Sequence, residues 1–448
     1  MELQKHCSTG AAFDSAARFD PPRCTNSTRL RIIQIIEEWI SSDGNTAVPS
    51  SLFWLHGGAG VGKSALAQSL AEKFQERGQL AASFFFFRND PTRNDGRLLV
   101  STLISHLVRT FKGIGPFVKD RIRENPAVFT KRSDTQIQEL LIEPLFALMS
   151  SGALVTHPQL IVIDGLDECE NTDVQCELLR AIARAIPQIP YPLRFLITSR
   201  PEAHITHVLS HDPDLQALTV REYNLSDDPD ADQDIRKFLE MEFMEIRQVH
   251  RLGQCLPVTW PDENIITSLV ERSSGHFIYA STVIRYIRSP KHRPDNRLEV
   301  ILRLRPPQEG DLPYAQLDTL YTLIFHGVEK LEKICLILGI LYFQSRRAGF
   351  FFELSSELTA IEALLGMEAG DLILLLDPVL SLVAIDRDEI RILHKSLFDY
   401  LLDSTRGGHL PFDLAQVHGL AATHILKQRI VEGVCRVFLS PPIYILIL

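Results

Sequence analysis

The chain has 448 residues, enough for two to four compact units, and its 45% hydrophobic and 23% charged residues are ordinary for a globular protein. The formal net charge of −10 argues against broad binding to nucleic acid or anionic lipid, because both require a basic face. No uninterrupted apolar run reaches the roughly 18 residues of a membrane span. The seven scattered cysteines form no CxxC pair, which fits reduced thiols, so we expect a cytoplasmic protein without a membrane partner.

The first segment of the chain, residues 1–28, is rich in small polar residues, and we expect it to be loosely ordered. The stretch "STRLRIIQIIEEWI" follows, with Leu30, Ile33, Ile36 and Ile40 on one helical face. The polar stretch "SSDGNTAVPS" then separates this predicted helix from the first predicted strand.

Residues 29–225 predict one α/β domain. Short apolar runs recur along it: "SLFWLH", "AASFFFFR", "PQLIVIDG", "PLRFLITSR" and "LQALTVREYNL". Longer amphipathic segments such as "LLVSTLISHLVRTF" and "DVQCELLRAIARAI" lie between most of them. The runs are continuously hydrophobic, which implies burial on both faces and therefore a parallel sheet covered by helices. We expect a doubly wound parallel sheet.

The character of the sequence changes after residue 225. The acidic start of "SDDPDADQDIRKFLEMEFMEI" suits a helix N-terminus, and a helical domain is predicted over 226–310. Residues 311–405 read as helices followed by "LVAIDRDEIRIL", two short strands around a charged turn, which predicts a winged-helix domain. Residues 406–448 are expected to form a helical C-terminal segment that the chain leaves unfinished.

A phosphate-binding loop is predicted between the first strand and the next helix. It matches GxxxxGK[ST] and consists of Gly57, Gly58, Ala59, Gly60, Val61, Gly62, Lys63 and Ser64. The glycines allow backbone N–H groups to converge on phosphate oxygens, and the following helix directs its positive end at the same anion. The lysine supplies charge for the β- and γ-phosphates, and the serine hydroxyl can bind Mg²⁺.

Acidic and basic residues follow two later strands. "LIVIDGLDECE" places Asp164 at the carboxyl end of a buried strand, where it can hold Mg²⁺, with Asp167 and Glu168 close enough to orient or polarise a water. The alternative is a solvated acidic turn. "RFLITSRPE" ends another strand at Arg200, which can sense the γ-phosphate or neutralise charge during its transfer; the alternative is a structural surface arginine. Ser199 is a weaker candidate.

Together these residues resemble the NACHT domain of the STAND class of P-loop NTPases, and more narrowly the large fungal set of NACHT proteins. Matches run in order over roughly residues 20–405: "LFWLHGGAGVGKSALA", "SFFFFRND", "LIVIDGLDEC", "FLITSRPE", "SSGHFIYASTVIRYI", "LDTLYTLIF" and "LHKSLFDYLLD". The small residue after Asp164, followed by "LDE", is specific to this class.

The resemblance implies ATP, or less often GTP, with Mg²⁺, held between the α/β, helical and winged-helix domains. The nucleotide would act as a switch between a closed monomer and an open, self-associating form in innate-immunity-like signal transduction. By motif position, Gly57, Gly62, Lys63 and Ser64 would bind phosphates and Mg²⁺, Asp164 would assist the metal, Glu168 or Asp167 would handle water, and Arg200 would be the sensor.

The resemblance also suggests two further contacts. His394 would reach the phosphates of the nucleotide, unless it is a histidine packed at a domain junction. Thr28 and Arg29 would approach the base or ribose, unless Ser27 or Thr28 simply caps the helix. Arg88, in "SFFFFRND", has no assigned role.

Members of the family commonly carry an effector domain and a repeat array, and we identify neither motif in these residues, so a sensor or effector partner is expected but unknown. The leading hypothesis is a switch that binds ATP and hydrolyses it slowly. One alternative is a scaffold that holds ADP without turnover. Another is a nucleotide-controlled DNA-binding regulator, against which the net charge and the acidic "IDRDEI" of the predicted wing both count. A small-molecule kinase fits least, because no second substrate pocket can be named.

Overall fold

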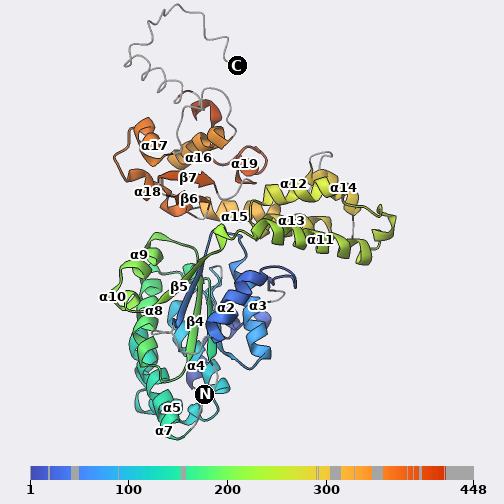
Figure 1. Ribbon diagram of the computed structural model, residues 1–448. Helices are drawn as coiled ribbons and strands as arrows, with labels where there is room; N and C mark the ends of the chain where they lie inside the picture. Colours follow the sequence, from blue (N-terminus) through green and yellow to red (C-terminus); the bar gives the residue numbers. More distant parts are fainter. Residues whose placement is uncertain are drawn as a thin grey trace, which may run out of the picture. The chain divides into compact units, whose positions relative to one another are not determined.

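The computed structural model describes residues 2–18, 21–41, 50–88, 90–152, 158–288, 290, 292–302, 314–326, 328–345, 357–380, 382–386, 388–392, 396–417 and 419. The chain divides into two compact units, residues 1–317 and 318–448 (Figure 1). In the part of the chain described above, no helix is both long and apolar enough to cross a membrane.

A five-stranded parallel sheet forms the centre of the first unit. Its strands are β1 (Leu52–His56), β2 (Leu80–Phe85), β3 (Gln159–Asp164), β4 (Leu193–Ser199) and β5 (Val220–Asn224), in the spatial order β2-β3-β4-β1-β5. Every neighbouring pair is parallel. The five predicted strands and their parallel arrangement are therefore confirmed.

Helices cover both faces of this sheet, as the buried residues of β1 show (Figure 1). Phe53 and Leu55 join a core with α2 (Leu30–Ser41) and α3 (Lys63–Glu76). Leu52 and Trp54 face the opposite core, which contains residues of α4, α5, α6, α7, α8 and α9. Those helices are α4 (Leu99–Thr110), α5 (Ile114–Glu124), α6 (Ser133–Ile137), α7 (Glu143–Ser150), α8 (Thr172–Ala185) and α9 (Ala203–His211). The doubly wound α/β class is confirmed.

The strand order fixes where a ligand can bind. From β1 the chain crosses to β2 at one edge, whereas from β4 it crosses over β1 to reach β5 at the other edge. The connections that leave these two neighbouring strands therefore run in opposite directions. In open α/β sheets the crevice at such a point, outside the carboxyl ends of the strands, is the usual ligand site.

The segment before α2 is better ordered than the sequence predicts. It contains α1 (Glu2–Lys5) and two short turns, η1 (Thr9–Ala11) and η2 (Ala16–Arg18), and it buries Leu3 and Ala11 in the core beside α4. Its backbone N–H groups at Ser8 and Phe13 donate to Thr102 Oγ1 at 2.9 Å and to Ser83 Oγ on β2 at 3.1 Å. We call residues 2–18 the N-terminal clasp. The expectation of a loosely ordered segment is wrong for these residues, because contacts with α4 and β2 order them although their sequence has no helical or strand periodicity.

A helical bundle follows the sheet within the first unit. Its helices are α11 (Ala231–Val249), α12 (Glu263–Ser273), α13 (Phe277–Ile287) and α14 (Pro294–Ile301). The short α10 (Pro213–Gln216) precedes β5. Isolated turns complete this unit: η3 (Gly96–Leu98), η4 (Pro126–Thr130), the π-helical η5 (Gln138–Ile142), η6 (Leu166–Glu168), η7 (Ile186–Gln188), η8 (Leu225–Asp227) and η9 (Gly253–Cys255).

Helices and one hairpin make up the second unit. The helix α15 (Ala315–Phe325) begins just before the division and is followed by α16 (Leu331–Ser345), α17 (Leu358–Leu365), α18 (Asp371–Leu376), η11 (Asp377–Val379) and α19 (Ser396–Leu401). The strands β6 (Val383–Asp386) and β7 (Glu389–Ile392) pair antiparallel, as expected for the predicted wing. The domain boundaries themselves stay predictions, and most of the expected C-terminal helical segment lies outside the described residues.

Candidate functional site

The glycine loop lies between the end of β1 and the start of α3. Gly62 has a φ of 101° and immediately precedes Lys63, the first residue of α3, so the chain turns into the helix through a left-handed position that favours glycine. Gly57 has a φ of 154°, and a Cβ atom there would lie 3.1 Å from both Ser226 Oγ and Val61 Cγ2. The loop therefore requires glycine at these two positions, and it directs the N-terminus of α3 toward the carboxyl edge of the sheet.

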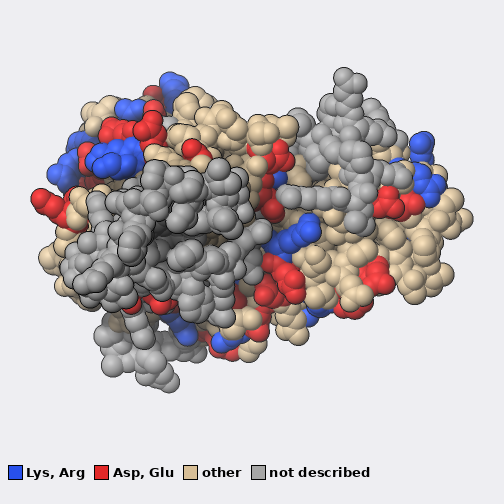
Figure 2. Space-filling view, turned by 90° about the horizontal axis from the view of Figure 1, so that it is seen from above, with Lys and Arg blue, Asp and Glu red and all other residues tan. Residues whose placement is uncertain are grey.

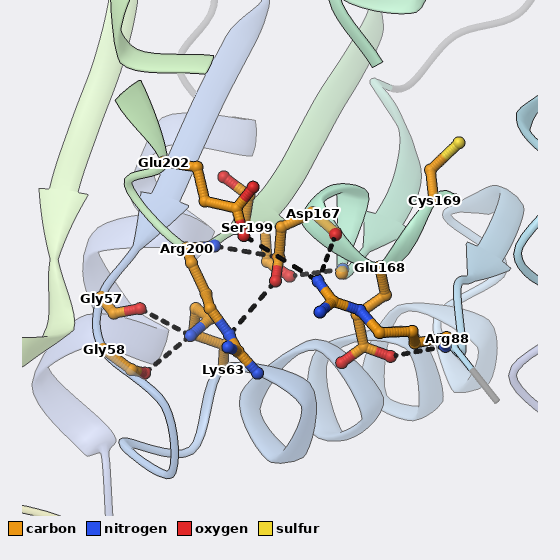
Figure 3. Close-up of polar contacts among 12 residues, drawn as sticks. Gly57, Gly58, Lys63, Arg88, Asp167, Glu168, Cys169, Ser199, Arg200 and Glu202 are labelled. Carbon is orange, nitrogen blue, oxygen red and sulfur yellow. Dashed lines mark hydrogen bonds and ion pairs between the residues drawn. The ribbon is translucent and has the colours of Figure 1, made fainter. Parts of the chain in front are cut away.

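The ammonium group of Lys63 lies within this loop. Its Nζ donates to the carbonyl oxygens of Gly57 at 2.6 Å and of Gly58 at 2.8 Å (Figure 3). Burial lowers the pKa of Lys63 to about 8, although the nearby Asp167 carboxylate acts in the opposite direction. A phosphate oxygen carries more charge than a backbone carbonyl and is a stronger acceptor, so this ammonium is suited to an anion at the same place.

Asp164 ends β3 and is buried. Thr198 Oγ1 donates to its Oδ1 at 2.6 Å. Burial raises the pKa of Asp164, and hydrogen bonds from Thr198 and Ser64 act against that rise. The structure thus brings Asp164 and Ser64, the two predicted metal ligands, together. One carboxylate and one hydroxyl fit Mg²⁺, which keeps several waters and binds through few protein groups.

Asp167 and Arg200 form a pair at the same edge of the sheet (Figure 3). The backbone N–H of Arg200 donates to Asp167 Oδ1 at 2.9 Å, and its guanidinium Nε lies 3.3 Å from Oδ2. Asp167 is 3% exposed, and its carbonyl accepts a hydrogen bond from Arg88 Nη2 at 3.0 Å. Both carboxylate oxygens of Asp167 are therefore occupied in orienting Arg200, which leaves Glu168 as the better placed group to act on a water.

Glu168 is partly buried and faces Arg88, whose backbone N–H donates to Glu168 Oε2 at 3.2 Å. Burial raises the pKa of Glu168 to about 7, and the charges of Asp167 and Asp164 raise it further. A carboxyl group with a pKa near neutrality is suited to general acid–base chemistry at physiological pH.

Ser199, the weaker candidate, has a structural contact. Its hydroxyl accepts a hydrogen bond from the indole Nε1 of Trp54 at 2.8 Å, and both residues are buried. Since Trp54 lies on β1 and Ser199 ends β4, this bond joins two neighbouring strands beneath the loop.

Arg29 connects the phosphate loop to the helical bundle. Its Nη2 donates to the carbonyl of Val61 at 2.8 Å, and Nη1 forms a buried ion pair with Asp228. Its backbone N–H donates to Asp234 Oδ2 on α11 at 2.8 Å, and the guanidinium lies 4.9 Å from the ring centre of Phe277. The guanidinium expected near the base or ribose is thus bound to protein groups.

Two other expectations concern single residues. Thr28 Oγ1 donates to the carbonyl of Thr25 at 3.0 Å, and Ile33 N–H bonds the carbonyl of Arg29. The helix therefore begins after Arg29, and the alternative of a cap by Ser27 or Thr28 is wrong. His394 lies outside the described residues.

Sequence reasoning missed contacts at three places in the site, one at η6 and two at the loop. Arg88 had no assigned role, yet it contacts both acidic residues of η6. Ser226, after β5, accepts a hydrogen bond from Gly58 N–H at 2.9 Å. The N–H of Ile278, in the first turn of α13, donates to the carbonyl of Gly60 at 3.1 Å. The left-handed Ser274 and Gly275 that turn the chain into α13 are the only local signal of this last contact.

Comparisons with known proteins bear on the fold. Residues 33–200, from α2 to the residue after β4, match the family described as Nephrocystin 3, N-terminal. No curated protein sequence matches the chain. Among solved structures, the Walker-type ATPase PABY2304 of Pyrococcus abyssi is similar at 17% identity with a TM-score of 0.50, over 83% of this chain and 96% of that chain.

Two further solved structures are similar at lower TM-scores. The ORC2 protein of Aeropyrum pernix, described in ADPNP and ADP complexes, has 14% identity and a TM-score of 0.44, over 92% of this chain and 98% of that chain. The Drosophila ORC, described as bound to DNA, has 12% identity and a TM-score of 0.38, over 89% and 90%. At these identities the similarity concerns the fold alone. The chain has the fold of a P-loop NTPase, and the closer resemblance to NACHT domains stays a prediction from the motifs.

Proposed function

We propose that this protein is a nucleotide-operated signalling switch of the NACHT type, which binds ATP or GTP with Mg²⁺, hydrolyses it slowly and couples the nucleotide state to self-association. The observation that carries this proposal is the gathering of Lys63, the Ser64–Asp164 pair and Glu168 at the carboxyl edge of the sheet.

Each group has a role in this proposal. The loop amides and the N-terminus of α3 would bind the phosphates, with Lys63 at the β- and γ-phosphates. Ser64 and Asp164 would hold Mg²⁺, which would neutralise charge on the phosphates. Glu168 would polarise the attacking water, and Arg200, oriented by Asp167, would sense the γ-phosphate.

The pairing of Arg200 with Asp167 supports a switch over a fast enzyme. Arg200 is bonded to Asp167 through its backbone N–H and its guanidinium, so its guanidinium must change partners before it acts on a phosphate. The loop is also bonded directly to the helical bundle, through Ile278 N–H and Arg29. A change at the loop can thus reach α11 and α13. Shifting two states from 1:99 to 99:1 takes about 5.5 kcal/mol of differential affinity.

The two alternative functions, a scaffold and a DNA-binding regulator, each predict a result different from that of the switch. A scaffold would hold nucleotide without turnover. A DNA-binding regulator would need a basic face, whereas basic and acidic side chains lie next to each other on the described face in Figure 2 and the net charge is −10. A salt-dependent shift with duplex DNA would favour this last alternative over the switch.

The loop lysine gives the first test. Lys63→Ala should abolish bound ATP, because the only side-chain charge inside the loop is removed. Its matched control is Lys73→Ala, three turns further along α3, where the ammonium instead pairs with Glu37 at 2.8 Å. Bound nucleotide is measured by chromatography of the denatured protein and by equilibrium titration with a fluorescent ATP analogue. Equal nucleotide content in Lys63→Ala and the control would contradict the proposal.

Glu168 gives the second test. Glu168→Gln should retain bound ATP, lose single-turnover hydrolysis and form a larger species by light scattering, whereas the exposed neighbour Glu170→Gln should behave as wild type. Hydrolysis by the wild type should rise as the pH rises through about 7, because the carboxylate form of Glu168 is the base. The raised pKa also means that the contribution of this group to folding stability falls between about pH 4.5 and 7. Wild-type hydrolysis by a monomeric Glu168→Gln protein would show that the mechanism is wrong.

A further inference from the structure

The N-terminal clasp carries a buried arginine, Arg18, that has no role in the proposed function. Arg18 ends η2 and is 9% exposed. A buried guanidinium is retained only where it is paired or well bonded, so its partners indicate what it holds.

The guanidinium lies between a helix and a strand. Its carbon atom Cζ is 3.6 Å from the ring centre of Phe85, the last residue of β2. Its Nη1 donates to Gln68 Oε1 on α3 and to the carbonyl of Phe13 within the clasp. Gln68 Nε2 donates to the same carbonyl at 3.1 Å, which closes a ring of hydrogen bonds between the clasp and α3.

These two partners lie next to the two proposed Mg²⁺ ligands. Gln68 is four residues after Ser64, and therefore one turn along the same face of α3. Phe85 is paired in register with Asp164 across β2 and β3. The guanidinium thus joins the helix that carries one ligand to the strand beside the other. The charge of Asp164 also raises the pKa of Arg18 against the effect of burial, which lowers it to about 10, so the two charges are close.

We propose that Arg18 is a positioning residue of the metal site: by joining Gln68 to Phe85 it fixes the spacing between Ser64 and Asp164 that Mg²⁺ requires. This inference rests on the proposed function, since it needs a nucleotide–metal complex at the loop. It assigns part of the site to the N-terminal clasp, more than 140 residues before Asp164 along the chain.

The probe for the test is Mn²⁺, measured by electron paramagnetic resonance on the full chain loaded with ADP. Loss of a residue that supports metal ligands typically costs 10- to 100-fold in metal affinity. Arg18→Met should weaken Mn²⁺ binding about tenfold and leave the affinity for ADP without metal unchanged. Arg18→Lys keeps the charge but not the planar stacking on Phe85, so it should fall between wild type and Arg18→Met.

The matched control is Arg77→Met, which removes a largely exposed arginine at the C-terminal end of α3 that pairs with Glu37 at 2.7 Å and should bind Mn²⁺ as wild type. Wild-type Mn²⁺ affinity in Arg18→Met, with only the melting temperature lowered, would overturn the inference. It would show that Arg18 contributes to packing and not to metal binding. If Arg18→Met does not fold, wild-type Mn²⁺ affinity in Arg18→Lys overturns it equally. If the wild type binds no ADP at all, the proposed function is wrong, and this inference is wrong with it.

Discussion

The two edges of the parallel sheet are protected in different ways. All six residues of β2 are buried, and α4 covers its free edge: Ser83 N–H donates to His106 Nδ1 at 3.3 Å, and Thr110 Oγ1 donates to the carbonyl of Ala81 at 3.1 Å. The N-terminal clasp packs beside it, where Phe13 N–H donates to Ser83 Oγ at 3.1 Å. At the opposite edge β5 is only partly buried and exposes Arg221 and Glu222. Covering an edge and charging it are two ways to prevent pairing with another chain. The comparison shows that β2 is protected by α4 and the N-terminal clasp, whereas β5 carries charged side chains where it is exposed.

Both edges also supply contacts to the candidate site, but to different parts of it. After β5, Ser226 bonds the N–H of Gly58, and Asp228 pairs with the arginine that holds the loop carbonyl of Val61. The clasp instead reaches α3 and β2, beside the proposed metal ligands. We therefore expect changes at the β5 edge to act on the phosphate loop, and changes at the β2 edge to act on the metal side.

The largest effect is expected at the β5 edge. Arg29→Met leaves Asp228 buried and unpaired, which should lower the free energy of unfolding of the first unit by about 3–5 kcal/mol. The double variant Arg29→Met, Asp228→Leu should recover part of this loss. Urea unfolding measures both. The control is Arg31→Met, whose pair with Asp230 at 3.6 Å is exposed and should contribute less than about 1 kcal/mol. Equal stability of Arg29→Met and the control would contradict the role of Arg29.

An intermediate effect is expected at the β2 edge. Leu3 is 3% exposed in the core beside α4, so Leu3→Ala should destabilise by about 2–3 kcal/mol through lost burial and a cavity. Leu30→Ala is the matched control, because that side chain is 55% exposed. Thermal unfolding followed by circular dichroism compares the two. A Leu3→Ala protein as stable as the control would mean that the clasp does not contribute to the core.

The smallest effect is expected for a change beside the phosphate loop, where nucleotide affinity and folding stability can be measured separately. Ser226→Ala removes the acceptor of the Gly58 N–H and should cost about 1 kcal/mol of unfolding free energy. Because that amide belongs to the loop, the affinity for an ATP analogue should also change, whereas the exposed Ser210→Ala on α9 should leave it unaltered. Isothermal titration tests this. Unchanged affinity in Ser226→Ala would show that the β5 edge does not act on the phosphate loop.

Much of the α/β core could be predicted because its signals are local. The run "LIVIDG" is apolar throughout, and it forms a strand buried on both faces with Asp164 at its end. The amphipathic "STRLRIIQIIEEWI" likewise gives α2, although only Ile36 and Ile40 of the predicted face are buried. Leu30 is 55% exposed, and Ile32 and Trp39 are buried in addition. Strand pairing was harder to predict, because nothing in the sequence places β1 between β4 and β5.

The contacts that hold the site were less predictable. Arg18 reaches Gln68 across 50 positions, and Ser226 reaches Gly58 across 168. Such contacts leave no periodicity or spacing in the sequence, because each joins single side chains from elements that only the fold brings together. For the same reason Asp167 and Glu168 looked alike as neighbours in "LDE", although one orients Arg200 and the other faces Arg88.

The sequence by itself determined the strands, the phosphate loop and the residue types at the carboxyl edge, since short-range patterns of burial and backbone freedom encode them. Only the tertiary structure decided which of those residues are occupied by protein partners and which can act on a ligand. It also decided that residues 2–18 pack against β2 and α4. The physical reason is that burial, charge and hydrogen bonding at the site depend on neighbours that are distant along the chain.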